Sequence, residues 1–180
     1  VNSQFAANLA AESESQPYSS YHTMLEQHPE IDVVSVLTPS GLHPEHVVEI
    51  ARKYRKHIVV EKPMALRLSD ADEMIRACDE AGVRLFVVKQ NRFNLPVIRL
   101  RQAIEAGRFG RITMGTVRVR WRRDQTYYDQ APWRGTWALD GGVFSNQASH
   151  HIDLLEWMLG EPVSVMAKTG TFLANIEVED

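Results

Sequence analysis

The chain has 180 residues, of which 44% are hydrophobic and 24% are charged, and its formal net charge at pH 7 is −3. This composition is typical of a globular protein and excludes the strongly basic surface that nucleic-acid binding needs. No apolar run is long enough to cross a membrane, and the single cysteine, Cys78, excludes an internal disulfide bond, so we expect a cytoplasmic protein that binds a small molecule.

Apolar strands and amphipathic helices alternate along the first half of the chain. Short runs rich in apolar and β-branched residues predict strands at 33–37, 57–60 and 83–88. Helical spacing of apolar residues predicts helices at 3–14, 21–27, 44–54 and 69–81, the last of them ending at Gly82. Repeated strand-helix alternation is typical of an α/β fold with a Rossmann-type doubly wound parallel sheet, which we assign to residues 1–109.

Polar residues follow each predicted strand. They are Thr38 and Pro39, then Glu61, Lys62 and Pro63, and then the run Lys89-Gln90-Asn91-Arg92. The carboxyl ends of parallel strands share one edge of the sheet, and open α/β sheets bind ligands at that edge. We therefore expect Lys62 to stand beside a binding crevice, although a surface Glu-Lys pair before a turn has the same sequence.

The second half of the chain has a different pattern. A helix is expected over 96–106, and residues 112–122 alternate with the period of two that is typical of an antiparallel strand. A second domain is therefore expected over 110–180. Two consecutive glycines, Gly141 and Gly142, precede a long helix predicted from about Ser145 to Leu159. The chain begins at Val1 and stops within a β-rich segment, so we expect a fragment of a longer protein.

Asn146, His150 and Asp153 have the spacing of residues on one face of that helix. Histidine suits proton transfer near neutral pH, and a nearby carboxylate can orient it. Polar residues on an exposed helix face would look the same. A zinc site using His43 and His151 as further ligands is a third reading, but adjacent histidines diverge on a helix and no His-Glu-x-x-His motif occurs, so we expect no metal.

The order of these motifs resembles the glucose-fructose oxidoreductase, inositol dehydrogenase and rhizopine-catabolism (Gfo/Idh/MocA) family of nicotinamide-dependent oxidoreductases. The motifs are Thr38-Pro39 with His43, Glu61-Lys62-Pro63, Gly141-Gly142, and His150 with Asp153. The resemblance implies a Rossmann domain followed by an α/β domain with a mostly antiparallel sheet. It also implies NAD or NADP as cofactor, a homo-oligomer, and a glycine-rich phosphate loop located before Val1.

The resemblance also implies roles for individual residues. The catalytic pair would be Lys62 and His150. The cofactor would contact Thr38, Pro39, His43, Glu61, Lys62, Gln90, Trp133 and Arg134. The substrate would contact Lys62, Asn91, Arg92, Asn146, His150 and Asp153. One position departs from the family pattern, because many polyol-oxidising members have Asp where this chain has Asn146, and Asn cannot deprotonate an imidazole.

The ordinary pKa values of lysine and histidine indicate which residue of the catalytic pair acts as the base. Lysine starts near about 10.4 and histidine near about 6.5, so at pH 7 only the histidine is easily available as a base. We therefore expect His150 to accept the hydroxyl proton and Lys62 to hold the oxygen as a charged hydrogen-bond donor.

Two segments, 88–94 and 146–153, are similar to those of bacterial nucleotide-sugar 3-dehydrogenases that oxidise UDP-N-acetylglucosaminuronate for surface polysaccharides. Such a substrate would give anionic partners to five arginines, although a solvated strand face would also explain most of them: Arg92, Arg118, Arg120, Arg122 and Arg123. Two alternatives remain open. One is an inositol or simple sugar dehydrogenase, and the other is a non-catalytic, cofactor-binding regulator with the same fold.

Overall fold

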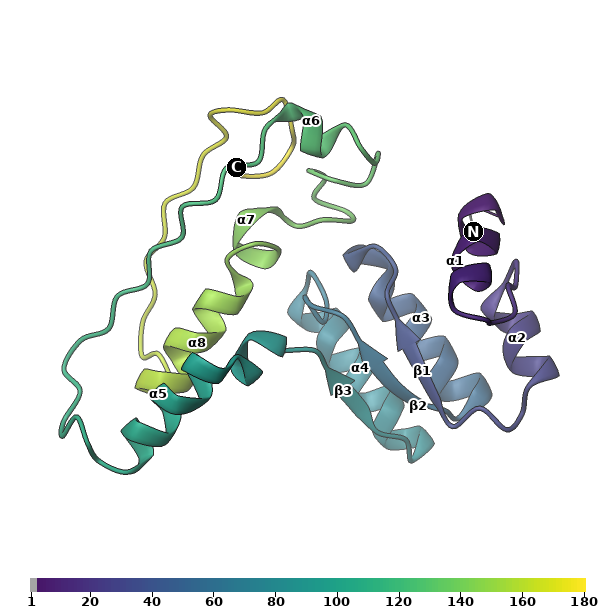
Figure 1. Ribbon diagram of the computed structural model, residues 1–180, viewed down its shortest axis with the longest axis horizontal. Helices are drawn as coiled ribbons and strands as arrows, with labels where there is room; N and C mark the ends of the chain where they lie inside the picture. Colours follow the sequence, from purple (N-terminus) through teal and green to yellow (C-terminus); the bar gives the residue numbers. More distant parts are fainter. Residues whose placement is uncertain (1–2) are drawn as a thin grey trace.

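The computed structural model describes residues 3–180 and has a three-stranded parallel sheet in the first half of the chain (Figure 1). The strands are β1 (Val33–Val36), β2 (His57–Val60) and β3 (Leu85–Val87), in the spatial order β1-β2-β3. Both neighbouring pairs are parallel, and Ile58 of β2 lies opposite Val34 and Leu85. The three predicted strands are confirmed, and β1 and β3 are shorter than predicted.

Two helical segments connect the strands and cover one face of the sheet (Figure 1). α3 (His43–Glu49) continues into a π-helical turn (Ile50–Tyr54), and α4 (Leu68–Ala81) connects β2 to β3. α3 and α4 pack against each other because right-handed crossovers between consecutive parallel strands leave both helices on the same face. The core lies between these helices and the sheet, and its fully buried side chains include Val47, Ile50, Ile58, Val60 and Met74.

α1 (Ser3–Glu12) and α2 (Tyr21–Gln27) lie on the β1 side of this layer (Figure 1). The Ser20 hydroxyl caps α2 by accepting a hydrogen bond from the backbone N–H of His22. Leu25 of α2 is buried in the core described above. The two helices predicted at 3–14 and 21–27 are therefore confirmed.

The other face of the sheet is uncovered within residues 3–180. Burial alternates along β1, and on its open face Val33 is 50% exposed. Leu37 is 69% exposed and Phe86 is 49% exposed. A doubly wound sheet has helices on both faces, so the prediction is met only in part. Apolar runs predicted that both faces need cover, but they could not indicate which segment supplies it.

The second half of the chain is mostly helical with long extended connections (Figure 1). Its helices are α5 (Leu95–Glu105), α6 (Gln125–Tyr128), α7 (Gly142–Ser145) and α8 (Ser149–Leu159). The predicted antiparallel strand over 112–122 is absent, because these extended residues have no ladder partner in the described chain. Met114 is 80% exposed and Trp121 57% exposed. A period of two is a local property, whereas a strand also needs a neighbour to bond with.

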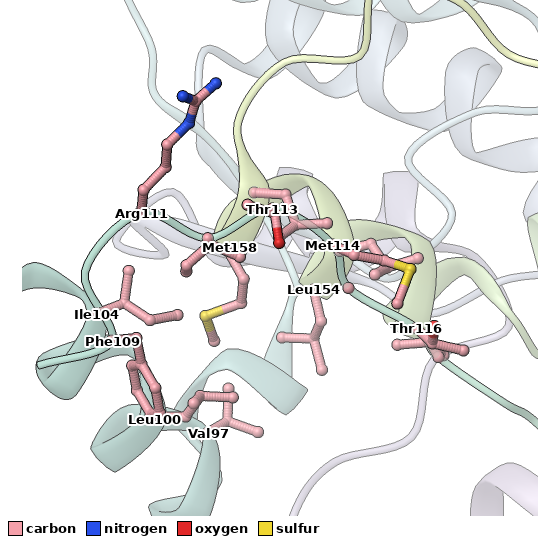
Figure 2. Close-up of a pocket in the computed structure, with 15 residues that line it drawn as sticks. Val97, Leu100, Ile104, Phe109, Arg111, Thr113, Met114, Thr116, Leu154 and Met158 are labelled. Carbon is pink, nitrogen blue, oxygen red and sulfur yellow. The ribbon is translucent and has the colours of Figure 1, made fainter.

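An apolar hollow of 460 Å³ lies between α5, α8 and the extended segment that follows α5 (Figure 2). Its lining side chains include Val97, Leu100, Leu154 and Met158, and among the described residues Arg111 is the only charged one that lines it. The hollow therefore belongs to the packing between α5 and α8 and offers nothing for acid-base chemistry.

Candidate active site

The polar residues after the three strands meet at the carboxyl edge of the sheet, as predicted. Thr38 and Pro39 follow β1, Glu61 and Lys62 follow β2, and Gln90 lies just beyond β3 at the start of a 3-10 turn. This edge faces the loop before α7. The loop after β1 contacts the loop before α7 through a backbone hydrogen bond. Their contact brings the Rossmann sheet and the second half of the chain together at one site.

Gly41 forms part of that contact. Its backbone N–H donates a hydrogen bond of 3.1 Å to the carbonyl oxygen of Leu139. A Cβ atom at position 41 would overlap the carbonyl oxygen of Ala138, so only glycine allows this close approach. The loop after β1 is therefore fixed against the segment that leads into α7.

His43 holds the first two strand-end loops together. Its side chain is 1% exposed, with Nε2 2.8 Å from the Thr38 carbonyl oxygen and Nδ1 2.8 Å from the Pro63 carbonyl oxygen. A neutral imidazole donates to one of these oxygens, and a protonated one donates to both. Both ring nitrogens of His43 thus have backbone partners, and a contact of His43 with the cofactor stays a prediction.

Lys62 reaches from the end of β2 to the second half of the chain. Its Nζ donates two hydrogen bonds of 2.9 Å, one to the backbone oxygen of Asn146 and one to its side-chain Oδ1. An ammonium has three N–H donors, so one remains for a substrate oxygen. Burial lowers the pKa of Lys62 and nearby Lys89 lowers it further, while Glu61 and Asp140 oppose the shift.

Asn146 lies in a break between two helices, which corrects the sequence prediction of one helix from Ser145 to Leu159. α7 ends at Ser145 and α8 begins at Ser149, so Asn146 does not share a helix face with His150. The carbonyl oxygen of Asn146 accepts hydrogen bonds from Lys62 Nζ and from the Ser149 hydroxyl. The break therefore presents a backbone carbonyl and a side-chain amide to the lysine, which a continuous helix would not do.

Asp140 is the residue that sequence reasoning missed. It is 1% exposed, and its Oδ2 accepts a hydrogen bond of 2.7 Å from the backbone N–H of Gly135. Its Oδ1 accepts a hydrogen bond from the side-chain amide of Asn146. The only signal in the sequence was an acidic residue directly before Gly141 and Gly142, and φ values of 84° and 79° at these glycines let the chain turn there.

His150 lies in the first turn of α8 and is half-buried. Burial is the main cause that lowers its pKa, and the positive charges of Lys62 and Lys89 and the neighbouring His151 lower it further. Asp153 opposes this shift. A lowered pKa favours the neutral imidazole, which is the form that can accept a proton.

Asp153, one turn along α8, joins this helix to the segment after β3. Arg92 donates to both carboxylate oxygens of Asp153 at 2.8 Å, and Lys89 Nζ lies 3.4 Å from one of them. Burial alone would raise the pKa of Asp153, but Arg92 and Lys89 outweigh it and hold that pKa below its usual range. The two oxygens fasten α8, with His150, to the sheet edge. A direct contact of Asp153 or Arg92 with substrate stays a prediction.

Replacing Asp153 by Asn should lower the free energy of unfolding by about 1–2 kcal/mol at pH 7, since it removes a charged partner of Arg92, which is itself 36% exposed. The folded-state pKa of Asp153 is lowered, so its contribution is present above the unfolded value of about 3.9 and is lost as pH falls through the folded value. The difference in free energy of unfolding between wild type and variant, measured by urea titration, should therefore be smaller at acidic pH than at pH 7. Glu161→Gln, at an exposed position just after α8, is the control, and a difference independent of pH would contradict the assignment.

The remaining predicted residues are spread along the same edge and loop. Gln90 is exposed and Asn91 half-buried, and neither side chain has a hydrogen-bond partner within the described residues. Arg134 donates to the Tyr127 carbonyl oxygen at 2.8 Å and lies over the Tyr127 ring, so it supports its own loop. Trp133, beside it, is half-buried. Lys62 and Asn146 are thus hydrogen-bonded and the charge of Lys62 acts on His150, whereas no hydrogen bond or ring contact among the described residues joins Trp133 or Arg134 to these three.

Two further properties concern residues 3–180 as a whole. No group of three histidine, cysteine, aspartate or glutamate side chains in that range is arranged to hold a metal ion. No helix in the same range combines the length and hydrophobicity needed to cross a membrane.

Two models of known protein families match this chain. Residues 1–89 match the GFO/IDH/MocA model described as an oxidoreductase family with an NAD-binding Rossmann fold. Residues 97–180 match the GFO/IDH/MocA C-terminal domain. The chain belongs to the Gfo/Idh/MocA family of oxidoreductases. Family membership predicted from the sequence motifs is therefore confirmed.

Two solved structures and one curated dehydrogenase are similar to this chain. The WlbA dehydrogenase from Bordetella pertussis, solved with NADH and UDP-GlcNAcA, is 51% identical with a TM-score of 0.94 over 99% of this chain and 55% of that one. WlbA from Chromobacterium violaceum, with the same ligands, is 47% identical with a TM-score of 0.92 over 97% of this chain and 50% of that one. A 1-carboxy-3-chloro-3,4-dihydroxycyclohexa-1,5-diene dehydrogenase from Comamonas testosteroni is 35% identical over 85% of this chain and 38% of that protein. The chain thus spans about half or less of the length of these relatives.

The residues at the sheet edge fit the nicotinamide cofactor that the Gfo/Idh/MocA family implies. Exposed Thr38 and Gln90 offer a hydroxyl and an amide, and Lys62 offers an ammonium with one free donor. Such groups suit the ribose hydroxyls and carboxamide of a nicotinamide nucleoside. Which part of the cofactor each of these groups contacts stays a prediction.

Proposed function

We propose that the protein is an NAD-dependent dehydrogenase that oxidises a secondary hydroxyl of a nucleotide sugar, most specifically C3 of a UDP-N-acetyl-hexosaminuronate. The observation that carries the proposal is the position of Lys62 at the carboxyl edge of the Rossmann sheet, where its charge acts on His150 of α8. Among the described residues only Asn146 accepts hydrogen bonds from Lys62 Nζ, which leaves one N–H for substrate, and burial and the charge of Lys62 lower the pKa of His150. The likeness to two dehydrogenases solved with NADH and UDP-GlcNAcA supports the choice of substrate.

In this mechanism the substrate hydroxyl lies between the two side chains. Lys62 donates its free N–H to the oxygen and stabilises negative charge that develops there. His150 accepts the hydroxyl proton while the adjacent C–H bond releases its electron pair as hydride, which leaves a ketone. When bound, the nicotinamide supplies the acceptor for that hydride. The protein contributes orientation, one hydrogen bond and one base.

An arginine-lined hollow supports an anionic substrate. Arg120, Arg122 and Arg123 line a space of 520 Å³ that Gln147 also lines, and Gln147 directly follows Asn146 in the chain. Guanidinium groups bind carboxylates and pyrophosphates with two parallel hydrogen bonds. Asp180 is the one acidic residue among the described residues that line this hollow, so three arginines face one carboxylate, and this excess of positive charge favours an anionic nucleotide sugar over a neutral polyol such as inositol.

A substrate panel tests the proposal in the complete protein. We expect rapid reduction of NAD with UDP-N-acetylglucosaminuronate, slower reduction with the matching sugar that lacks the carboxylate, and none with myo-inositol. Stopped-flow absorbance of the reduced nicotinamide is the measurement. Preference for inositol would support a polyol dehydrogenase instead, and cofactor binding without reduction by any sugar would support a regulator.

The proposal includes a homo-oligomer, because the Gfo/Idh/MocA family often uses its second domain for self-association. Sedimentation velocity of the complete protein checks this part, and a monomer at micromolar concentration would contradict it.

A further inference from the structure

We propose that Asp140 is a positioning residue, which acts through the Asn146 amide to aim the Lys62 ammonium at the reacting oxygen and to balance its charge. The inference rests on the proposed function for the identity of that oxygen. The geometry that supports it is a continuous chain of hydrogen bonds from Lys62 through Asn146 and Asp140 to the backbone of Gly135.

Each hydrogen bond in the series from Lys62 to Gly135 has only one possible direction. The Lys62 ammonium can only donate, so Asn146 must turn its amide oxygen toward it. The amide nitrogen of Asn146 then points at Asp140 as a donor, and the backbone N–H of Gly135 donates to the other oxygen of Asp140. Two donors thus converge on side chain 140. An ionised carboxylate accepts from both, whereas an amide at that position would turn its NH₂ group against one of them.

The buried charge of Asp140 also indicates a link to Lys62, whichever way the Asn146 amide is oriented. Asp140 is 1% exposed, and its hydrogen-bond partners, Asn146 and Gly135, are both neutral. A buried carboxylate needs a compensating charge, and the Lys62 ammonium lies at the other end of the Asn146 amide. Asp140 raises the pKa of Lys62, which expresses the same attraction. Lys62 therefore supplies positive charge that compensates Asp140 from the other side of the Asn146 amide.

Other charged groups surround Lys62, and the test must hold them constant. Glu61 on the same loop raises its pKa, and Lys89 from the segment after β3 lowers it. His150 of α8 also feels the charge of Lys62. None of these groups is in the hydrogen-bond chain, so exchanging side chains 140 and 146 leaves them in place.

The experiment compares Asp140→Asn, Asn146→Asp and the double variant that exchanges the two side chains, all in the complete protein. Asp140→Asn should lower kcat by about 10²-fold, because a misdirected amide releases Lys62, while NAD affinity is unchanged. In the double variant the carboxylate at position 146 accepts from Lys62 and from the amide at position 140, and the oxygen of that amide accepts from Gly135. This exchange satisfies the whole chain again and should recover most of the lost activity. Asp129→Asn, at an exposed position of the α6 loop, removes the same charge and should have no effect.

Competitive acetylation of Lys62 across pH, read by mass spectrometry, gives a readout that needs no substrate. Only the neutral amine reacts, so the labelling curve reports the pKa of Lys62. It should move to lower pH in Asp140→Asn and return to the wild-type position or above it in the exchange variant. The falling limb of kcat at high pH should move in the same directions, since Lys62 must be charged to hold the oxygen.

The role of Asp140 would be refuted by any of three results. Wild-type kcat and an unshifted labelling curve in Asp140→Asn would overturn the proposal, as would a loss that the exchange does not reverse in a folded protein. If Asp140→Asn does not fold, the exchange variant carries the test: a carboxylate needed at 140 only for structure would leave it unfolded too, and that result overturns the proposal. Labelling curves that shift as stated, without oxidation of any nucleotide sugar, would refute the proposed substrate and leave the Lys62–Asp140 coupling intact.

Discussion

Replacing Lys62 by Met in the complete protein should lower kcat by about 10²–10³-fold while NAD affinity changes little. Methionine has similar length but neither charge nor N–H donor, so the substrate oxygen loses the group that stabilises it as its proton leaves. The lysine position itself is set by its two hydrogen bonds to Asn146, which Met cannot make.

Single-turnover kinetics and isothermal titration with NAD separate the two effects. Lys168→Met, which removes the same charge from an exposed site, is the control and should turn over normally. Equal kcat in Lys62→Met and wild type would refute the role of Lys62. A large loss of NAD affinity with kcat preserved would instead make the lysine a cofactor ligand only.

The second large effect is expected at His150. In the wild type, kcat/KM for oxidation should rise with pH through the pKa of His150, because only the neutral imidazole can accept the hydroxyl proton. Burial, Lys62, Lys89 and His151 all lower that pKa, so the rise should be centred below the ordinary histidine value of about 6.5.

His150→Asn should lower kcat by about 10²–10⁴-fold and abolish the pH-dependent rise. His151→Asn, at the next position of the same helix, should keep it. A rise that survives in His150→Asn but disappears in Lys62→Met would reverse the assignment and make the lysine the base.

The features that were predictable from the sequence are those with a local cause. β-branched runs gave the three strands, and the polar residues after them had to lie at one edge once the sheet was parallel. Gly82, predicted to end the helix before β3, adopts a left-handed φ of 68° there. Lys62 is predictable at the sheet edge for the same reason, because β2 directly precedes it, whereas its two hydrogen bonds to Asn146 are not.

The features that the sequence did not reveal depend on contacts between distant segments. The carbonyl oxygen at the helix break, that of Asn146, accepts a hydrogen bond from Lys62, which is 84 positions away in the chain. Asp140 is a different case, because its partners Gly135 and Asn146 are only five and six positions away, but they lie in irregular turns that no sequence periodicity predicts. The alternation over 112–122 predicted a strand, but pattern alone cannot supply the neighbouring strand that the ladder requires.

Arg92 and Asp153 show a different limit. Their residue types suit substrate recognition, and the sequence similarity pointed that way. In the structure each is the main partner of the other, and together they fasten α8 to the sheet edge. A sequence places such groups near a site but does not determine whether they bind a ligand or one another.

The central claim is that hydride passes from C3 of a nucleotide-sugar uronate to the nicotinamide at the Lys62–His150 site. The most direct measurement is a single turnover of the complete protein with NAD and UDP-N-acetylglucosaminuronate deuterated at C3, followed by mass analysis of both products. We predict that deuterium appears on the reduced nicotinamide, that the sugar becomes a 3-ketone, and that Lys62→Met slows the transfer. Reduced cofactor without deuterium, or no reduction in the presence of bound cofactor and sugar, would contradict the account.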